Sequence, residues 1–143
     1  MIRTLMLAAL LVGVVDGAPV QAADFVVIVN PQVEVSHLSL EALKRIYRKE
    51  KTEWPGGEAI VPFDHAGSSS LRESFCEKVF GATVSEVQNF WINKKMTAGI
   101  IGPRVFKSST LMKKFVANTP GGIGYIPPED VDDTVKIVTI DGL

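Results

Sequence analysis

The sequence has few of the residues that form disulfides, metal sites or catalytic centres. It contains one cysteine, Cys76, and two histidines, His37 and His65, among 143 residues. One cysteine cannot form an internal disulfide, so packing alone must stabilise the fold. The histidines and the cysteine also lack the paired spacing of a zinc site. We therefore expect no metal, no cofactor, and both histidines at the surface.

Long hydrophobic runs are also absent. The apolar stretch from Leu5 to Val15 has 11 residues, about half of the ~20 that a membrane-spanning helix needs. It follows Arg3 and precedes Val20-Gln21-Ala22-Ala23, whose small residues suit a signal peptidase. We therefore expect residues 1–22 to be a cleaved signal peptide and residues 23–143 to form a single periplasmic domain without a membrane anchor.

Neither sign of charge dominates the composition. The chain has 15 Lys and Arg against 16 Asp and Glu, a formal charge of −1 that removal of Arg3 and Asp16 with the signal peptide would leave unchanged. Nucleic acids attract strongly basic proteins. We therefore expect no nucleic-acid partner, and we interpret the basic residues between Lys44 and Lys51, which Glu50 interrupts, as a solvated helix face.

Segments with the apolar pattern of strands alternate along the chain with segments of helical spacing. Continuous runs rich in Val and Ile predict strands at residues 25–29, 59–63, 123–126 and 135–140. Apolar residues spaced by three and four predict helices that begin after Ser39, near Ser70, after Thr83 and after Ser108. This alternation predicts an α/β fold, a three-layer sandwich with a mostly parallel central sheet.

In the third and fourth predicted helices, the spacing of the apolar residues predicts which face is buried. Thr83 and Glu86 have the T-x-x-E form of a capping box, which would start the third helix at Val84. We expect this helix to bury Val87, Phe90 and Trp91. We expect the fourth helix to bury Leu111, Met112, Phe115 and Val116.

A glycine-serine turn, Gly67-Ser68-Ser69-Ser70, lies between a predicted strand and a predicted helix. The first backbone N–H groups of a helix lack internal partners and favour an anion. Serine hydroxyls would add donors, and Arg72 in the first helical turn would add a positive charge. The competing interpretation is structural, with Ser70 as an N-cap and the other serines as loop.

The free energy available from a helix start is too small for this turn to bind an anion by itself. A helix start contributes about 0.3 to 1 kcal/mol to anion binding, whereas millimolar affinity needs ~4 kcal/mol. The turn therefore needs a cation and a facing wall that excludes water. Ser108-Ser109-Thr110 is a second serine-rich helix start, which would either face the first across a crevice or, the interpretation we favour, cap its own helix.

Three residues near the turn have the types of a hydrolase triad. Asp64, His65 and Ser68 fall within five positions, however, and the G-x-S-x-G elbow is missing. Because a triad is defined by the mutual geometry of its members, neighbours in sequence rarely form one. We therefore expect no catalytic residues and no enzyme.

Several short motifs occur in a fixed order between Val26 and about Ile126. They are the strand Val27-Ile28-Val29-Asn30, the helix Leu38 to Tyr47, the turn around Trp54, the segment Gly67 to Phe75, Trp91, and the ending Val116 to Ile126 with Thr119-Pro120-Gly121-Gly122-Ile123-Gly124-Tyr125. This ordered set resembles the phosphate-binding components of bacterial ABC transporters, which have two lobes of the type-two periplasmic-binding fold. The resemblance covers one lobe.

The resemblance implies an anion-binding site, but this sequence departs from the family pattern in two ways. In that family the serine-glycine turn donates to phosphate, which implies anion-binding roles for Gly67, Ser68, Ser69 and Ser70. Asp64 stands where the family usually has an arginine, so Arg72 would have to replace that arginine. A carboxylate there repels a phosphate dianion unless it accepts a hydrogen bond from a protonated oxyanion.

The second departure is that the lobe which closes over the ligand is largely missing. Either another chain supplies the wall, for example in a homodimer, or tight ligand capture has been lost. The resemblance thus implies a periplasmic binding protein for phosphate or a similar oxyanion that works with an ABC permease. The alternative is a non-catalytic sensing or interaction module built on the same lobe.

Overall fold

The structure is a computed structural model that describes residues 24–67 and 69–143, so the predicted signal peptide and Ser68 lie outside the described residues. In chain order the elements are β1 (Val26–Val29), β2 (His37–Ser39), α1 (Leu40–Tyr47), β3 (Val61–His65), α2 (Ser70–Phe75), the π-helical turn η1 (Cys76–Phe80), α3 (Val84–Ala98), β4 (Arg104–Phe106), α4 (Ser109–Asn118), β5 (Gly122–Ile126), the 3-10 turn η2 (Pro128–Asp130) and β6 (Lys136–Asp141).

The six strands form one sheet in the order β2-β6-β1-β5-β3-β4. β2 pairs in parallel with β6, and β3 pairs in parallel with both β4 and β5. Only β1 runs against its two neighbours, β5 and β6. The predicted mostly parallel sheet is therefore confirmed. The apolar run of β1 is explained by its central place, since Val27, Ile28 and Val29 are buried.

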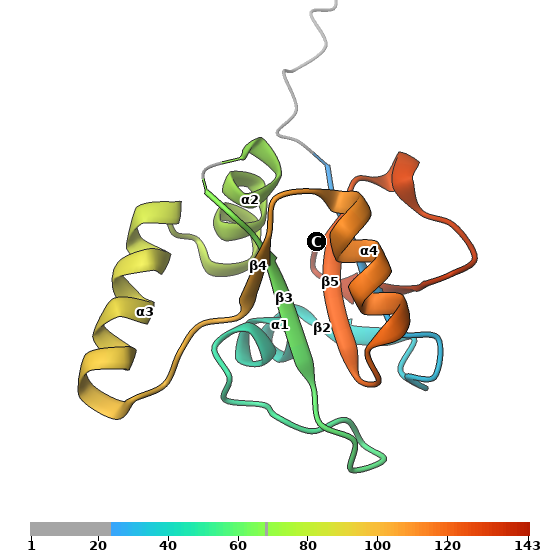
Figure 1. The fold of residues 1–143 in the computed structure, drawn as a ribbon, viewed down its shortest axis with the longest axis horizontal. Helices are drawn as coiled ribbons and strands as arrows, with labels where there is room; N and C mark the ends of the chain where they lie inside the picture. Colours follow the sequence, from blue (N-terminus) through green and yellow to red (C-terminus); the bar gives the residue numbers. More distant parts are fainter. Residues whose placement is uncertain (1–23, 68) are drawn as a thin grey trace, which may run out of the picture.

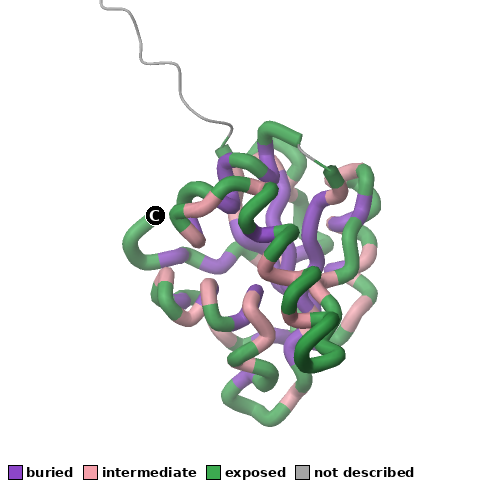
Figure 2. Tube along the Cα trace, turned by 90° about the vertical axis from the view of Figure 1, so that its left-hand side faces the viewer, coloured by how far each residue is buried: buried purple, intermediate pink, exposed green. Residues whose placement is uncertain are grey.

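Helices cover both faces of the sheet and bury two separate apolar clusters. On one face α1, α2 and η1 pack through Leu43, Tyr47 and Phe75 against alternate residues of β1 and β5. On the other face α4 packs through Met112 and Val116 against the intervening strand residues. The predicted three-layer sandwich is therefore confirmed, and Figure 2 shows the buried residues gathered in its interior strands.

The local signals for helix starts agree with the structure in most cases. Ser39 and Ser108 are N-caps whose hydroxyls accept from backbone N–H groups, and Thr83 forms the predicted capping box with Glu86. The predicted strand at residues 59–63 lies two residues later, at Val61–His65. β2 was not predicted, because its three residues show only one buried side chain and pair at the edge of the sheet.

Helix α3 differs from its prediction. Of its predicted core residues only Val87 is buried, while Phe90 and Trp91 are half-buried. The helix stands to one side of the sheet rather than on either of its faces (Figure 1), and Trp91 packs over the backbone of Gly102. The apolar spacing of α3 thus reflects a shallow contact. In α4, Leu111 was also expected in the core and is exposed.

Membrane-crossing elements are missing from the part of the chain that the structure describes. None of the helices within residues 24–67 and 69–143 has both the length and the apolar character that a bilayer span requires.

Candidate functional site

The candidate site lies where two neighbouring parallel strands end. β3 ends at His65 beside the end of β4 at Phe106, and the N–H of Ala66 donates to the Phe106 carbonyl at 2.9 Å. After β3 the chain enters α2 on one face of the sheet, and after β4 it enters α4 on the other face. In open α/β sheets, such a change of face at the carboxyl ends of strands forms the crevice in which ligands bind.

The turn before α2 presents exposed polar groups at this end of the sheet. Gly67 has a φ of +69°, a left-handed backbone conformation that favours glycine. Ser69 is the N-cap of α2, since its hydroxyl accepts from the N–H of Arg72 at 3.2 Å. The predicted cap, Ser70, is therefore wrong by one residue. Because the Ser69 hydroxyl accepts this bond, its own hydrogen remains available to a ligand.

Arg72 lies underneath the turn rather than on its outer surface. It is 6% exposed, and its Nη1 donates to the Gly67 carbonyl at 2.9 Å. Its Nε lies 3.8 Å from Oδ2 of Asp64 and has no hydrogen-bond partner among the described residues. The guanidinium thus ties the turn to the end of β3 and places a positive charge behind it.

Asp64 points into the protein rather than toward the exposed turn. It is 5% exposed, and its Oδ1 accepts from the Tyr125 hydroxyl at 2.5 Å and from the N–H of His65 at 2.8 Å. Together with Arg72 these contacts satisfy a carboxylate that would be costly to bury alone. The charge that would repel an anion is therefore compensated from within the protein.

His65 is buried, which contradicts its expected place at the surface. Its Nε2 lies 2.8 Å from the carbonyl oxygen of Tyr125, and its ring meets the Tyr125 ring edge-on at a centroid distance of 4.8 Å. The carboxylate of Asp64 bonds the backbone N–H of His65, not its imidazole. The described residues therefore do not show the aspartate-to-imidazole bond that orients the base of a triad.

Tyr125 is the residue of this site that the sequence did not reveal, because the glycine-rich strand β5 predicts only core packing. Its ring stacks on Phe75 at a centroid distance of 3.9 Å, and its hydroxyl reaches Asp64. Burial, followed by the charge of Asp64, raises the pKa of Tyr125 well above its ordinary value. The one available signal was Asp64 itself, since a carboxylate in a buried strand requires a partner.

Two further acidic groups near Asp64 are held in their neutral forms. Tyr47 is buried with its hydroxyl on the Phe63 carbonyl at 2.8 Å, and burial raises its pKa well above 10.0. Burial, with a smaller contribution from Asp64, also raises the pKa of Cys76 to about 11. The thiol is therefore a packed core group rather than a nucleophile.

We expect alkaline titration to reveal this burial. Tyr47 and Tyr125 are the only tyrosines of the chain, and tyrosines in an unfolded chain ionise at about pH 10. Because both native pKa values are raised, the stability that the neutral phenols contribute is complete below about pH 10 and is lost as the pH rises above it. Tyrosinate absorbance should therefore appear only together with the loss of circular dichroism.

The urea-unfolded protein is the control for this titration and should ionise near the ordinary value. Tyrosinate absorbance that develops at about pH 10 while the circular dichroism is unchanged would show that at least one phenol is accessible in the folded state.

The second serine-rich helix start is a cap, as favoured from the sequence. The Ser108 hydroxyl accepts from the N–H of Leu111 at 3.1 Å. Metal ligands do not gather here either. Among residues 24–67 and 69–143, three or more His, Cys, Asp or Glu side chains nowhere lie close enough to hold a metal ion.

Comparisons with known proteins agree with this geometry. No protein-family model matches the chain. The phosphate-binding protein PstS of Bacillus subtilis (strain 168) is 31% identical over 121 residues, which are 80% of this chain and 35% of that protein. A crystal structure of a putative phosphate ABC transporter substrate-binding protein with bound phosphate, from Clostridium perfringens, is 26% identical with a TM-score of 0.68, over 83% of this chain and 45% of that one.

A third relative shows the same fold at lower identity. The ABC-type phosphate transport receptor from Vibrio cholerae is 21% identical with a TM-score of 0.66, over 82% of this chain and 46% of that one. The chain spans about a third of the length of its curated relative and less than half of the two solved structures. By fold and by sequence, the chain is similar to phosphate ABC transporter substrate-binding proteins, over less than half of their length.

Proposed function

We propose that this protein binds phosphate or a similar oxyanion in the periplasm and works with an ABC-type permease. The observation that carries the proposal is the exposed serine turn at the start of α2, at the carboxyl end of β3, with the Arg72 guanidinium behind it. Gly67, Ser68, Ser69 and Ser70 would supply the donors. The relatives are named as phosphate-binding proteins or receptors, which favours a binding role over a catalytic one.

The buried pair sets the charge behind the turn. Arg72 contacts the turn itself through the Gly67 carbonyl, whereas Asp64 lies farther inside against Tyr125. The pair therefore presents its positive end to the turn while adding little net charge. In this proposal Arg72 and Asp64 support the anion site from behind, and the hydroxyls and backbone N–H groups make the contacts.

A facing wall is still required, because the donors of one exposed turn compete with water. The start of α4 follows β4 at the same end of the sheet and lies on its other face. In this proposal a second protein chain, either another copy or a separate protein, covers the turn and its bound anion.

Calorimetric titration with phosphate tests the proposal. Wild-type protein should release or absorb heat at millimolar phosphate. The double variant Ser69→Ala, Ser70→Ala should bind at least about a hundredfold more weakly, since hydrogen bonds to a charged group contribute about 1.5–3 kcal/mol each. Ser39→Ala removes an equivalent N-cap hydroxyl from α1 and should leave binding unchanged. Equal heats for wild type and the double variant would overturn the proposal.

One observation favours a second candidate, a non-catalytic sensing or interaction module. Arg72 and Asp64 are both buried and face each other, so the strongest charges of the site are already partly compensated. This candidate predicts that a specific periplasmic protein is recovered with the chain and that phosphate does not change the recovery. Loss of that protein in the presence of phosphate would exclude it.

A further inference from the structure

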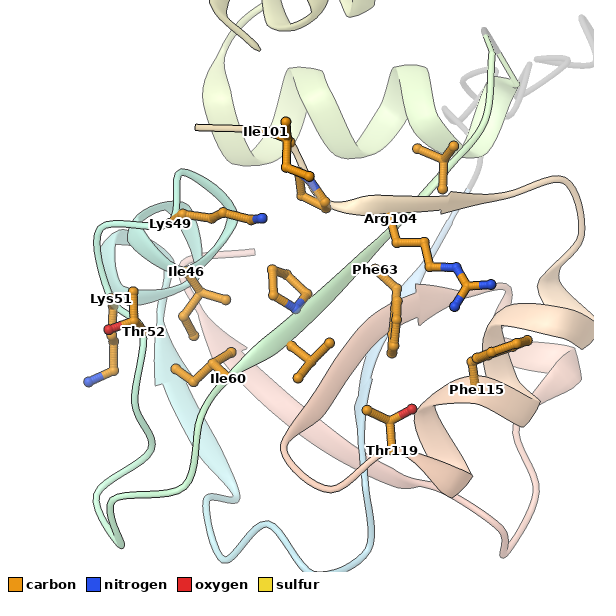
Figure 3. Close-up of a pocket in the computed structure, with 15 residues that line it drawn as sticks. Ile46, Lys49, Lys51, Thr52, Ile60, Phe63, Ile101, Arg104, Phe115 and Thr119 are labelled. Atoms are coloured by element: carbon orange, nitrogen blue, oxygen red, sulfur yellow. The ribbon is translucent and has the colours of Figure 1, made fainter. Parts of the chain in front are cut away.

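The turn from Gly67 to Ser70 is called the anion turn below. A groove of about 910 Å³ lies at the opposite end of β3 from this turn (Figure 3). It is bounded by the end of α1, the start of β3, residues 101–105 and α4. β3 enters the groove at Val61 and reaches the turn only after His65, so the two places lie at different ends of the strand. We propose that this groove binds an organic anion that has an apolar body.

The floor of the groove is apolar. Ile46, Ile60 and Phe63 form its base and are already buried in the core, whereas Val61 and Phe115 are half-buried and Ile101 stands at the rim with 62% of its surface exposed (Figure 3). Apolar side chains that line a solvent-filled concavity gain free energy when an apolar group displaces the water. A small inorganic ion would leave Val61, Phe115 and Ile101 uncovered, so the ligand needs a hydrocarbon or aromatic portion.

The charged residues of the groove have one sign. Lys49, Lys51 and Arg104 are present, and the described residues that line the groove include no Asp or Glu. Arg104 is held in place because its guanidinium lies 4.7 Å from the ring centroid of Phe115 and 5.1 Å from that of Phe106. In Figure 3 the Lys49 side chain extends over the groove from the other side, while Lys51 points away from it.

Lys49 occupies its position at a conformational cost. Its φ of +59° makes it the one residue other than glycine with a positive φ among residues 24–67 and 69–143. Glycine adopts this conformation freely, whereas a lysine does not. Residues with strained backbone conformations cluster at ligand sites, where the function of the side chain offsets the cost of the strain. Here that use is a cation above an apolar floor.

These features select the ligand class. The volume lies in the range of about 300–1,000 Å³ typical of small-molecule sites. An anionic head would pair with Lys49 or Arg104 while the apolar body covers Val61, Phe115 and Ile101. A carboxylate or phosphate on an alkyl or aromatic body meets both requirements, whereas a cationic or neutral amphiphile meets only the second.

Titration of the isotope-labelled protein with octanoate, followed by amide chemical shifts, tests this inference. Octanoate should shift the amides around Ile60 to Phe63 and Ile101 to Val105. It should bind more tightly than 1-octanol and octyltrimethylammonium, which have the same chain length. Lys49→Gly and Arg104→Gln should each weaken octanoate binding about two- to fivefold, as expected for exposed ion pairs.

Lys49→Gly separates a binding defect from a folding defect. Because glycine relieves the positive φ, the variant should unfold at the same or a higher temperature while it binds octanoate more weakly. Octanol binding as tight as octanoate, shifts confined to other surfaces, or no shift at millimolar octanoate would each overturn the inference.

Octanoate binding in the groove should not depend on the anion turn. Ser69→Ala, Ser70→Ala should bind octanoate as wild type does, and inorganic phosphate should not compete with it. Failure of phosphate binding at the turn would leave the groove result unaffected, and competition by phosphate for the groove would contradict a separate site.

Discussion

Replacing Asp64 with alanine is expected to lower the free energy of unfolding by about 3–5 kcal/mol, the loss typical when one partner of a buried ion pair is removed. Asp64 and Arg72 are 5% and 6% exposed, so the variant leaves a guanidinium in the interior without its counter-charge. The Tyr125 hydroxyl and the N–H of His65 lose their acceptor at the same time. Urea denaturation measures the change.

Asp132 offers the matched control, because its ion pair is closer but lies at the surface. Its Oδ2 is 2.7 Å from Nζ of Lys113, against 3.8 Å between Asp64 and Arg72. Surface pairs contribute little despite good geometry, since water screens both charges. Asp132→Ala should therefore shift the urea midpoint far less than Asp64→Ala. Equal shifts would show that the buried Asp64 network stabilises the fold no more than a surface ion pair does.

Replacing both partners should restore part of the loss. The double variant Asp64→Leu, Arg72→Met removes both buried charges and fills the space with apolar atoms. It should be more stable than Asp64→Ala, although the Tyr125 hydroxyl still lacks its acceptor. A double variant that is less stable than the single one would indicate that Arg72 stabilises the fold mainly through Gly67.

Replacing Gly121 with alanine is expected to cost about 3 kcal/mol or more, from a left-handed backbone together with a steric clash. Gly121 has a φ of +74°, and a Cβ there would lie 1.9 Å from the backbone oxygen of Ala59. The chain cannot easily move away, because the Gly121 carbonyl accepts from Nε1 of Trp54 and from the N–H of Val61, both at 3.0 Å. Thermal unfolding measures the loss.

Gly99 separates the two causes. It has a similar φ of +66°, but a Cβ there would meet no atom within 4 Å. Gly99→Ala should therefore cost only the backbone contribution of about 1–2 kcal/mol. If Gly121→Ala were no more destabilising than Gly99→Ala, the close approach of the two segments would not hold in solution.

The parts of the fold that could be predicted from the sequence depend on neighbours along the chain. The capping box of Thr83 and Glu86 and the N-cap Ser39 need contacts over three residues only. The apolar run of β1 required no knowledge of its partners, because a strand in the middle of a covered sheet is buried on both sides. Fold class followed from the order of such segments.

The parts that were wrong or missed depend on contacts between distant segments. His65 is buried because its ring reaches the carbonyl of Tyr125, which is 60 residues away. The spacing of Phe90 and Trp91 predicts a buried helix face, yet nothing local could show that α3 would lie beside the sheet. The pairing of β2 with β6 at the edge of the sheet could not be predicted either, because β2 has only three residues and they carry no strand pattern.

The candidate site shows the same division. The serine turn was found from its composition and its place before a helix, and the shift of the cap from Ser70 to Ser69 is a one-residue error. The buried network could not be predicted, because Asp64 meets Tyr125 only when β3 and β5 become neighbours in the sheet. That network decides whether Arg72 faces a ligand or supports the turn from behind.

Phosphate titration of the isotope-labelled protein, followed by amide chemical shifts, tests most directly whether the turn before α2 binds an oxyanion. Progressive, saturable shifts of the Gly67, Ser69 and Ser70 amides, absent in Ser69→Ala, Ser70→Ala and preserved in Ser39→Ala, are the predicted result. Amides at the turn that stay unchanged at phosphate concentrations of several millimolar would contradict it.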